Sequence, residues 1–461
     1  MSASTTMCFN RLDSLRIRQA AALESPRHSR LGHTVEAEGS QTSRSTDNGI
    51  GSHVSENAVQ VSTGTEYQRW EFEDKVTASA SAATGTGAFA DAEPFGGALL
   101  GAEWLAKSMP GGDLGEPVKT NQDAVTASVV DKRAGIVFAG VFDGHGEHGH
   151  VVSQRVASDM LTNLQAHAGW NGGRGIAETG GKSTLDQAFI DACNATNDGL
   201  ADLGYRKVDL RVSGTTAVMA LLDLAAQRVM VANVGDSRAF LCRSAPGGKI
   251  MWSPLSHDHS PSREDECARI ESNGGIITPI VIDGEQIGPP RIWRQDPARP
   301  GEAGGGPGLC MTRSFGDLEG AEIGLHCEPE MCVAGIRTHD LRSSSGSEVQ
   351  GAQPGEAAPP STSGDLTGKP TDDLLLVLAS DGLFEYHATE DVAGTIVDAF
   401  CTEGGGQGGL KRAATIALEN ARSAWVSDKG EIIDDCTILI ARIYPQSGKT
   451  GKKAAKARAA E

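Results

Sequence analysis

Apolar residues gather in short runs along the middle of the chain, and these runs alternate with segments of helical periodicity. Runs rich in Val, Ile, Leu and Phe, bounded by Gly, Asp or Ser, predict strands at 134–142, 215–224, 228–234, 239–242, 374–379 and 436–444. Apolar residues three or four positions apart predict helices at 151–168, from Ser183 to about Leu200, from Ser260 or Ser262 to Gly274, from Thr389 to the glycine run 404–406, and at 410–425.

The order and spacing of these elements indicate the fold class. Several strands follow one another through short connections, which favours antiparallel sheets, and the helices come in pairs that can cover outer sheet faces. We therefore predict an α+β fold, a four-layer sandwich of two antiparallel β-sheets flanked by helix pairs.

Three segments lack this patterning. Residues 1–86 are dominated by Ser, Thr, Gly, Ala and charge and are expected to form a disordered extension. A Gly/Pro/Ser-rich insertion at 343–373, which we expect to be disordered, separates two strands, and 446–461 is a basic Lys/Ala tail. One domain is predicted between them, at 87–445.

Composition narrows the partners and the compartment. The formal net charge of −19, from 41 Lys+Arg against 60 Asp+Glu, argues against nucleic acid as a partner. Nine single cysteines without a CxxC pair indicate a reduced intracellular protein, in cytoplasm or nucleus. No apolar stretch approaches the roughly 18 residues of a membrane span. The first residues are rich in Ser, Thr and Arg, which leaves targeting to an organelle open. We expect the protein to be a monomer.

Aspartates recur where the predicted strands begin or end. Asp143, Asp236 and Asp381 each follow an apolar run, and Asp434 precedes the last strand. Asp123, in KTNQDAV, opens a first strand that lies ahead of the run at 134–142. Any one of them is best explained as a turn residue. Five could meet at one edge of an antiparallel sandwich, where carboxylates repel one another unless cations neutralise them. Oxygen ligands of this kind suit Mg²⁺ or Mn²⁺.

Such a cluster predicts a hydrolytic chemistry. Two cations roughly 3.5–4 Å apart would lower the pKa of a shared water and orient it for attack on phosphorus. The leaving oxygen then needs a proton, and His145, two residues after Asp143, is placed to supply it. A lone histidine in a glycine-rich loop is usually a surface residue, but its neighbour Asp143 favours the catalytic interpretation.

Eight sequence motifs occur in an order that resembles a known family. They are KTNQDA, VFDGHGEHG, SGTTAV, VANVGDSRAFL, LSHDHSP with RIESNGG, PGLCMTRSFGD, LVLASDGLFE and DDCTILIA. Together they resemble protein phosphatase type 2C, the metal-dependent family of Ser/Thr phosphatases, over about residues 87–445. The resemblance implies hydrolysis of phosphoserine and phosphothreonine in phosphorylated protein substrates, with two Mg²⁺ or Mn²⁺ ions and a third, weaker one.

The same resemblance implies roles for single residues. Asp143 would bridge both metals, with the Gly144 carbonyl as a further ligand, while His145 would act as general acid. The remaining implied metal ligands are Asp381 and Asp434 at one metal, Asp123 through water at the other, and Asp236 at the third, which Asp381 and Glu385 would share. The segment at about 276–308 would form a flap that shapes substrate access.

Three positions depart from the family pattern. Gln122 stands where many members have Glu, so metal affinity is expected to differ. Val118 stands where animal members have a phosphate-binding Arg, and the adjacent Lys119 is our candidate for that role. Glu385 replaces an Asp and keeps its charge.

Other interpretations carry less support. Cys436-x5-Arg442 has the spacing of a cysteine phosphatase, but the run between them is apolar and β-branched and reads as a buried strand. A phosphate loop at Gly181-Lys182-Ser183 fails because Gly175 stands one residue too far away. The serious alternative is a catalytically inactive phosphatase-like binding module, against which the full acid set argues.

Overall fold

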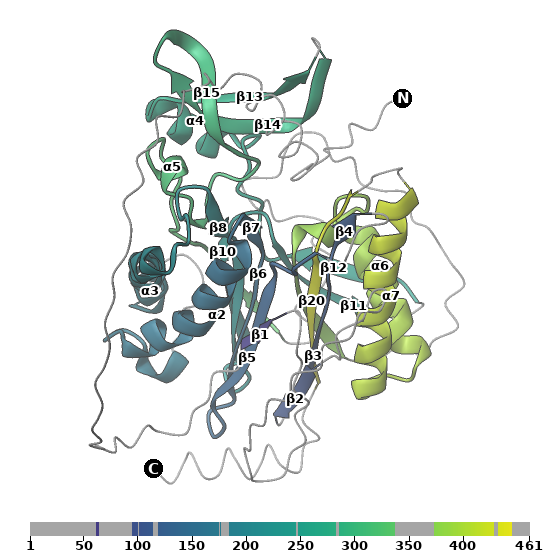
Figure 1. Cartoon of the computed structure of the whole chain (residues 1–461). Helices are drawn as coiled ribbons and strands as arrows, with labels where there is room; N and C mark the ends of the chain where they lie inside the picture. The colour runs from purple at the N-terminus through teal and green to yellow at the C-terminus, as the bar shows by residue number, and fades with distance from the viewer. Residues whose placement is uncertain are drawn as a thin grey trace, which may run out of the picture.

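Two antiparallel sheets stacked face to face form the centre of the molecule (Figure 1). The structure is a computed structural model that describes residues 61–63, 95–99, 101–113, 119–174, 176, 184–245, 248–282, 285–336, 373–427 and 432–444. Within the predicted disordered extension at 1–86, the prediction is wrong for Val61–Thr63, which form a strand, β1, because they pair with β5 (Ala124–Asp131). The rest of this extension, the predicted disordered insertion at 343–373 except Asp373, and the basic tail lie outside the described residues.

Each large sheet has six strands, and every neighbouring pair is antiparallel. The first sheet has the order β1 (Val61–Thr63), β5 (Ala124–Asp131), β6 (Ile136–Phe142), β9 (Ala217–Asp223), β10 (Arg228–Val234), β17 (Glu330–Gly335). The second has the order β12 (Ile250–Pro254), β11 (Arg238–Ser244), β18 (Leu374–Ala379), β20 (Cys436–Ile443), β3 (Ala102–Met109), β2 (Phe95–Leu99).

Helices cover the outer faces of both sheets. α2 (Gly149–Ala166) and α3 (Thr184–Gly199) lie on the first sheet, and α6 (Thr389–Thr402) and α7 (Gly406–Ser427) lie on the second (Figure 1). Short 3-10 turns adjoin these helices: η1 (Asn171–Gly173) comes after α2, η2 (Leu200–Arg206) follows α3, and η3 (Asp381–Leu383) precedes α6. The predicted four-layer α+β sandwich is confirmed.

The continuous apolar runs of the central strands follow from burial on both faces. In β18, Leu374, Leu376 and Leu378 point into the core between the sheets, whereas Leu375 and Val377 point toward α6 and α7. Each such side chain contributes about 1.5–3 kcal/mol on leaving water, so these strands hold the sandwich together. Both faces being apolar is also why the sequence shows no alternation here.

A smaller unit stands at one end of the sandwich, at the top of Figure 1. It contains a three-stranded sheet that spans 276–308, the segment for which the resemblance implies a flap, and we call this sheet the flap. The unit rests on an apolar cluster that includes Ile270 and Ile292. Its elements are α4 (Glu264–Ser272), β13 (Gly275–Ile282), β14 (Glu285–Asp296), β15 (Arg299–Leu309) and α5 (Leu318–Ala321).

Several boundaries differ from the prediction. The helix expected from Ser260 or Ser262 begins at Glu264, because those two hydroxyls hydrogen-bond to each other at 2.6 Å in the preceding turn. The run 215–224 is divided at Thr216 into β8 (Ser213–Thr215) and β9. The last long helix starts at Gly406 within the glycine run, and its Gly409 packs too closely against Phe400 for any side chain.

Two small sheets complete the edge where the strands end. One has the order β16 (Phe315–Gly316), β8, β7 (Gly144–Gly146), and the other pairs β19 (Ile432–Ile433) with β4 (Gly112–Asp113). Among the described helices, none has the length and apolarity needed to cross a membrane.

Candidate metal centre

The register of the first sheet places two predicted aspartates side by side. Ala124, the first residue of β5, pairs with Phe142, the last residue of β6. Asp123 directly precedes that pair and Asp143 directly follows it, so both lie at the same edge. Asp123 is buried and Asp143 is half-buried.

The second sheet brings its aspartates to the facing edge. Ala379, the last residue of β18, pairs with Ile438 in β20, so Asp381 and Asp434 lie at one end of this sheet. The two edges meet, because the Ser380 hydroxyl donates a 2.9 Å hydrogen bond to Asp123. Aspartates from distant parts of the sequence therefore form one acidic cluster.

Burial and mutual repulsion both raise the pKa values of two members of this cluster. Burial raises the pKa of Asp123 to about 8, with further contributions from the charges of Asp435 and Asp434. Burial likewise raises the pKa of Asp381 to about 8, assisted by Asp236 and Asp434. Desolvation and neighbouring like charge both disfavour the ionised form, so the cluster demands compensation by positive charge.

The pKa values of Asp143 and Asp236 are also raised by burial and by neighbouring negative charge. Burial, followed by the charges of Asp123 and Asp381, raises the pKa of Asp143 well above its usual value. Burial and the charge of Asp258 raise the pKa of Asp236 to about 6. A group of carboxyls with raised pKa values in one place is typical of a functional site.

The donor set fits Mg²⁺ or Mn²⁺. The Oδ1 atoms of Asp123, Asp236 and Asp381 are buried and have no hydrogen-bond partner among the described residues, so oxygen ligands stand available. In the described part of the chain, no three His, Cys, Asp or Glu side chains already converge with the spacing of a complete metal site. The fit of Mg²⁺ or Mn²⁺ to this cluster therefore rests on the preference of these ions for oxygen ligands and on the three buried Oδ1 atoms.

Gly144 is required by the close approach of the backbone. A Cβ atom at this position would lie 2.4 Å from the carbonyl oxygen of Gln122 and 2.5 Å from that of Gly149. The Gln122 side chain donates a 2.7 Å hydrogen bond to the carbonyl oxygen of Gly146. Gln122 thus braces the loop that carries His145.

Lys119 lies against the acids. Its Nζ is 3.2 Å from Asp434 and 2.8 Å from Asp435, and only 12% of its side chain is exposed. The ammonium supplies part of the positive charge that the cluster needs. Val118, the position of the phosphate-binding arginine of animal members in the resemblance, lies outside the described residues.

Asp435 lies in the motif DDCTILIA, and the sequence analysis assigned it no role. Its carboxylate accepts hydrogen bonds from the backbone amides of Gly111 at 2.6 Å and Gln122 at 2.9 Å, besides its ion pair with Lys119. It therefore fixes the segment that leads into Asp123.

His145 has a buried carboxylate partner that the sequence analysis missed. Its Nε2 lies 2.6 Å from Oδ2 of Asp317, and the Ser314 hydroxyl donates to the same oxygen at 2.5 Å. Burial lowers the pKa of His145, but the charge and hydrogen bond of Asp317 outweigh burial, and the net shift is upward. Asp317 is the last residue of the motif PGLCMTRSFGD and directly follows β16. It therefore stands at the end of a strand, which is the position by which the other aspartates were identified.

The structure also places Glu385 and the pair Cys436 and Arg442. Glu385, the implied partner at the third metal, is half-buried just beyond η3. Cys436 is buried, and burial raises the pKa of its thiol well above the usual value, with the nearby aspartates adding to the effect. Arg442 pairs with Glu103 and Asp373 at the far end of β20, so the spacing Cys436-x5-Arg442 forms no phosphate cradle.

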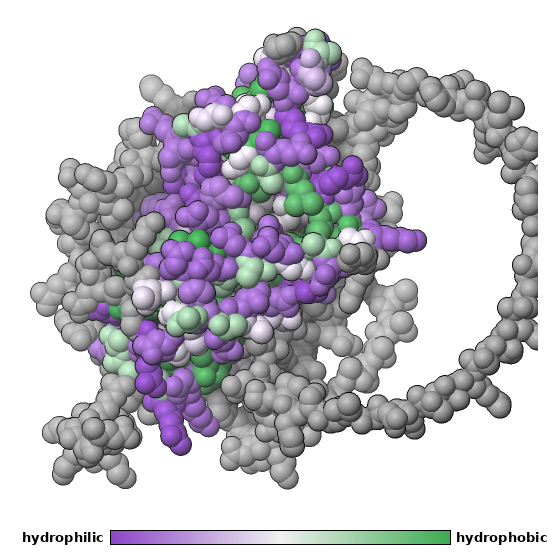
Figure 2. Space-filling model, turned by 90° about the vertical axis from the view of Figure 1, so that its left-hand side faces the viewer, coloured by the Kyte–Doolittle hydropathy of each residue, from purple (hydrophilic) through white to green (hydrophobic). Residues whose placement is uncertain are grey.

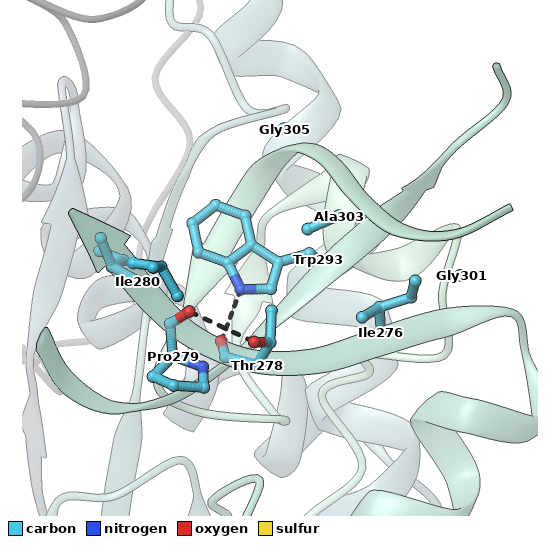
Figure 3. Close-up of a pocket in the computed structure, with 9 residues that line it drawn as sticks. Ile276, Thr278, Pro279, Ile280, Trp293, Gly301, Ala303 and Gly305 are labelled. Carbon is cyan, nitrogen blue, oxygen red and sulfur yellow. Dashed lines mark hydrogen bonds between the residues drawn. The ribbon is translucent and has the colours of Figure 1, made fainter. Parts of the chain in front are cut away.

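The flap carries an apolar pocket of about 530 Å³ on the β13–β15 sheet (Figure 3). Its wall includes the Trp293 ring, whose indole N–H donates a 2.8 Å hydrogen bond to the carbonyl oxygen of Thr278. Val281 also lines the pocket and is 58% exposed. The face of the molecule in Figure 2 is otherwise mainly hydrophilic, with apolar residues in small groups.

Comparisons with known proteins agree on one family. A family model described as "Protein phosphatase 2C" matches residues 119–429. The relative "Probable protein phosphatase 2C 61" of Arabidopsis thaliana is 28% identical over 321 residues, covering 69% of this chain and 79% of its own length. "Probable protein phosphatase 2C 35" of the same plant is 26% identical over 356 residues, covering 72% and 81%.

A solved structure shows the same fold. The serine-threonine phosphatase 2C from Toxoplasma gondii aligns with a TM-score of 0.55 at 20% identity, covering 77% of this chain and 98% of its own.

Proposed function

Because this chain belongs to the protein phosphatase 2C family, we propose that it hydrolyses phosphoserine and phosphothreonine in proteins, using metal ions held by the aspartate cluster. The observation that carries the proposal is the convergence of Asp123, Asp143 and Asp381, three strand-end carboxyls with raised pKa values, at the edge where the two sheets meet.

The aspartates are the proposed ligands. Asp143 would hold both of two Mg²⁺ or Mn²⁺ ions with the Gly144 carbonyl. Asp381 and Asp434 would serve one ion and Asp123 the other, and Asp236 would hold a weaker third. Bound ions would lower the pKa of a water and offset the charge of the phosphate. Lys119 supports phosphate binding in this proposal, since it supplies the adjacent positive charge.

His145 is the proposed general acid. Its Nε2 is engaged with Asp317, whereas its buried Nδ1 has no hydrogen-bond partner among the described residues. Nδ1 is therefore the ring atom that can carry a transferable proton to the leaving serine or threonine oxygen. The carboxylate of Asp317 favours the imidazolium that holds this proton.

A direct experiment tests the function. Purified full-length protein should hydrolyse p-nitrophenyl phosphate and phosphoserine or phosphothreonine peptides in Mn²⁺ or Mg²⁺, and chelation should abolish turnover. Asp143→Ala should be inactive while keeping its thermal unfolding transition. If the wild type is inactive at saturating Mn²⁺ but still binds phosphopeptides, the binding-module alternative is the correct function.

Partners and compartment follow from the same proposal and from the sequence. We propose phosphorylated proteins as substrates, a monomeric enzyme, and an intracellular location in cytoplasm or nucleus. The net charge of −19 keeps nucleic acid outside the proposal.

A further inference from the structure

A buried glutamate lies outside the aspartate cluster. Glu266, in the first turn of α4, has 0% of its surface exposed. A buried charge costs several kcal/mol unless it is fully paired, so the partners of this side chain decide what it does.

Two arginines and one hydroxyl satisfy both oxygens of Glu266. Arg269 binds it in a bidentate manner at 2.8 and 2.7 Å, and Arg313 donates to Oε1 at 2.6 and 3.1 Å. The hydroxyl of Thr312 donates to Oε2. Burial alone would raise the pKa of Glu266, but these hydrogen bonds outweigh it and hold the pKa well below its usual range. The carboxylate is therefore a permanent charged anchor.

The anchored residues directly precede the segment that carries Asp317. Ser314, next to Arg313, donates to the same Asp317 oxygen that contacts His145. Between them β16 pairs with β8, and β8 pairs with β7, the strand that contains His145. Hydrogen bonds, together with the peptide link between Arg313 and Ser314, thus connect α4 to the proposed general acid.

The same anchor is attached to the flap. Arg269 donates to the carbonyl oxygens of Thr312 and Gly324, both at 2.9 Å. α4 leads directly into β13, the first strand of the flap, and contacts it. Glu266 thus lies where α4, the helix that leads into the flap, contacts the segment 312–317, which carries Asp317, the partner of His145.

We propose that Glu266 is a positioning residue: by holding Thr312 and Arg313, it keeps Asp317 in hydrogen-bonding contact with His145 and so supports protonation of the leaving group. The inference rests on the proposed function. A purely structural anchor would lower stability and slow all substrates equally, whereas a positioning residue acts most where the leaving group needs a proton.

Glu266→Gln is the informative variant, because it keeps the shape and removes the charge. We expect kcat for a phosphoserine peptide to fall about tenfold more than kcat for p-nitrophenyl phosphate, whose phenolate leaves without protonation. Thr312→Val removes one hydrogen bond to Glu266 and keeps the charges around it. The ratio of kcat for the phosphoserine peptide to kcat for p-nitrophenyl phosphate should therefore fall in this variant too, but by less. Glu103→Gln is the matched control, since it breaks a mostly buried carboxylate–Arg442 pair in the second sheet; its ratio should equal that of the wild type.

A second readout does not depend on catalysis. The proton between His145 Nε2 and Asp317 should give a strongly downfield ¹H NMR signal in the metal-free full-length protein, assigned by its loss in Asp317→Asn. We expect this signal to be present in wild type and Glu103→Gln and lost or shifted in Glu266→Gln and Thr312→Val. An unchanged signal together with equal slowing of both substrates would overturn the inference. If the wild type has no phosphatase activity, the proposed function fails while the NMR comparison still decides the positioning role.

Discussion

His145 and Asp317 are 172 residues apart in the sequence, yet their side chains are joined by a 2.6 Å hydrogen bond beside the aspartate cluster. The carboxylate is fully buried and occupies one ring nitrogen, which fixes the imidazole and leaves the other nitrogen for chemistry. A histidine positioned by a buried carboxylate is a recurring arrangement for moving a proton.

Asp317→Asn should therefore uncouple proton donation from metal chemistry. The amide keeps the shape but loses the charge that offsets burial of His145, so the pKa of the imidazole should fall. We expect kcat for phosphoserine peptides to drop on the order of 10²-fold, with a much smaller loss for p-nitrophenyl phosphate. Steady-state kinetics with both substrates measures this, and His145→Ala provides the reference. Equal losses for the two substrates in both variants would remove His145 from the role of general acid.

Asp381→Asn should separate metal binding from folding. Its carboxyl lies among repelling neighbours, so replacing it relieves repulsion in the metal-free protein while removing a proposed ligand. We expect turnover to fall on the order of 10³-fold, with the metal-free melting temperature unchanged or higher. Calorimetric titration with Mg²⁺ should show weakened binding. Wild-type turnover in this variant would place Asp381 outside the metal site.

The sequence predicted the fold class and most of the cluster, but the strands β2, β3, β12 and β17 of the two large sheets were not predicted. Apolar runs identify the central strands, and Asp123, Asp143 and Asp381 are recognisable because each adjoins such a run. Asp317 was missed because β16 is only two residues long and has no apolar run to draw attention to its end.

The local pattern of residues did not predict the hydrogen bonds and ion pairs between segments that are distant in the sequence. Asp434 and Asp435 are adjacent acids, and only the folded chain shows that Asp435 accepts the backbone amides of Gly111 and Gln122. Lys119 was predicted from its place beside Val118, but its contacts with these acids depend on the approach of a segment more than 300 residues away. Such contacts are set by tertiary packing.

Lys119→Met should reveal what this ammonium does. The change keeps an unbranched apolar stem and leaves Asp434 and Asp435 without their cation. Because the pair with Asp435 is largely buried, we expect the free energy of unfolding of the metal-free protein to fall by about 3–5 kcal/mol, measured by urea denaturation. If Lys119 also binds the substrate phosphate, KM for a phosphopeptide should rise about tenfold. An unchanged KM would confine Lys119 to the role of counter-ion.

Metal-free protein should lose stability as pH rises, and metal should restore it. The folded-state pKa values of Asp123 and Asp381 are raised from 3.8 to about 8, and that of Asp236 to about 6. The folded chain therefore binds more protons than the unfolded chain between about pH 4 and pH 8, so the free energy of unfolding falls across this window. Urea denaturation in chelator at pH 5.5 and pH 8 measures the fall. Cations bind the ionised carboxylates, so Mg²⁺ should stabilise the protein more at pH 8 than at pH 5.5. A triple replacement of Asp123, Asp236 and Asp381 by Asn should lose most of the pH dependence and of the Mg²⁺ effect; if it keeps both, these carboxyls are not their source.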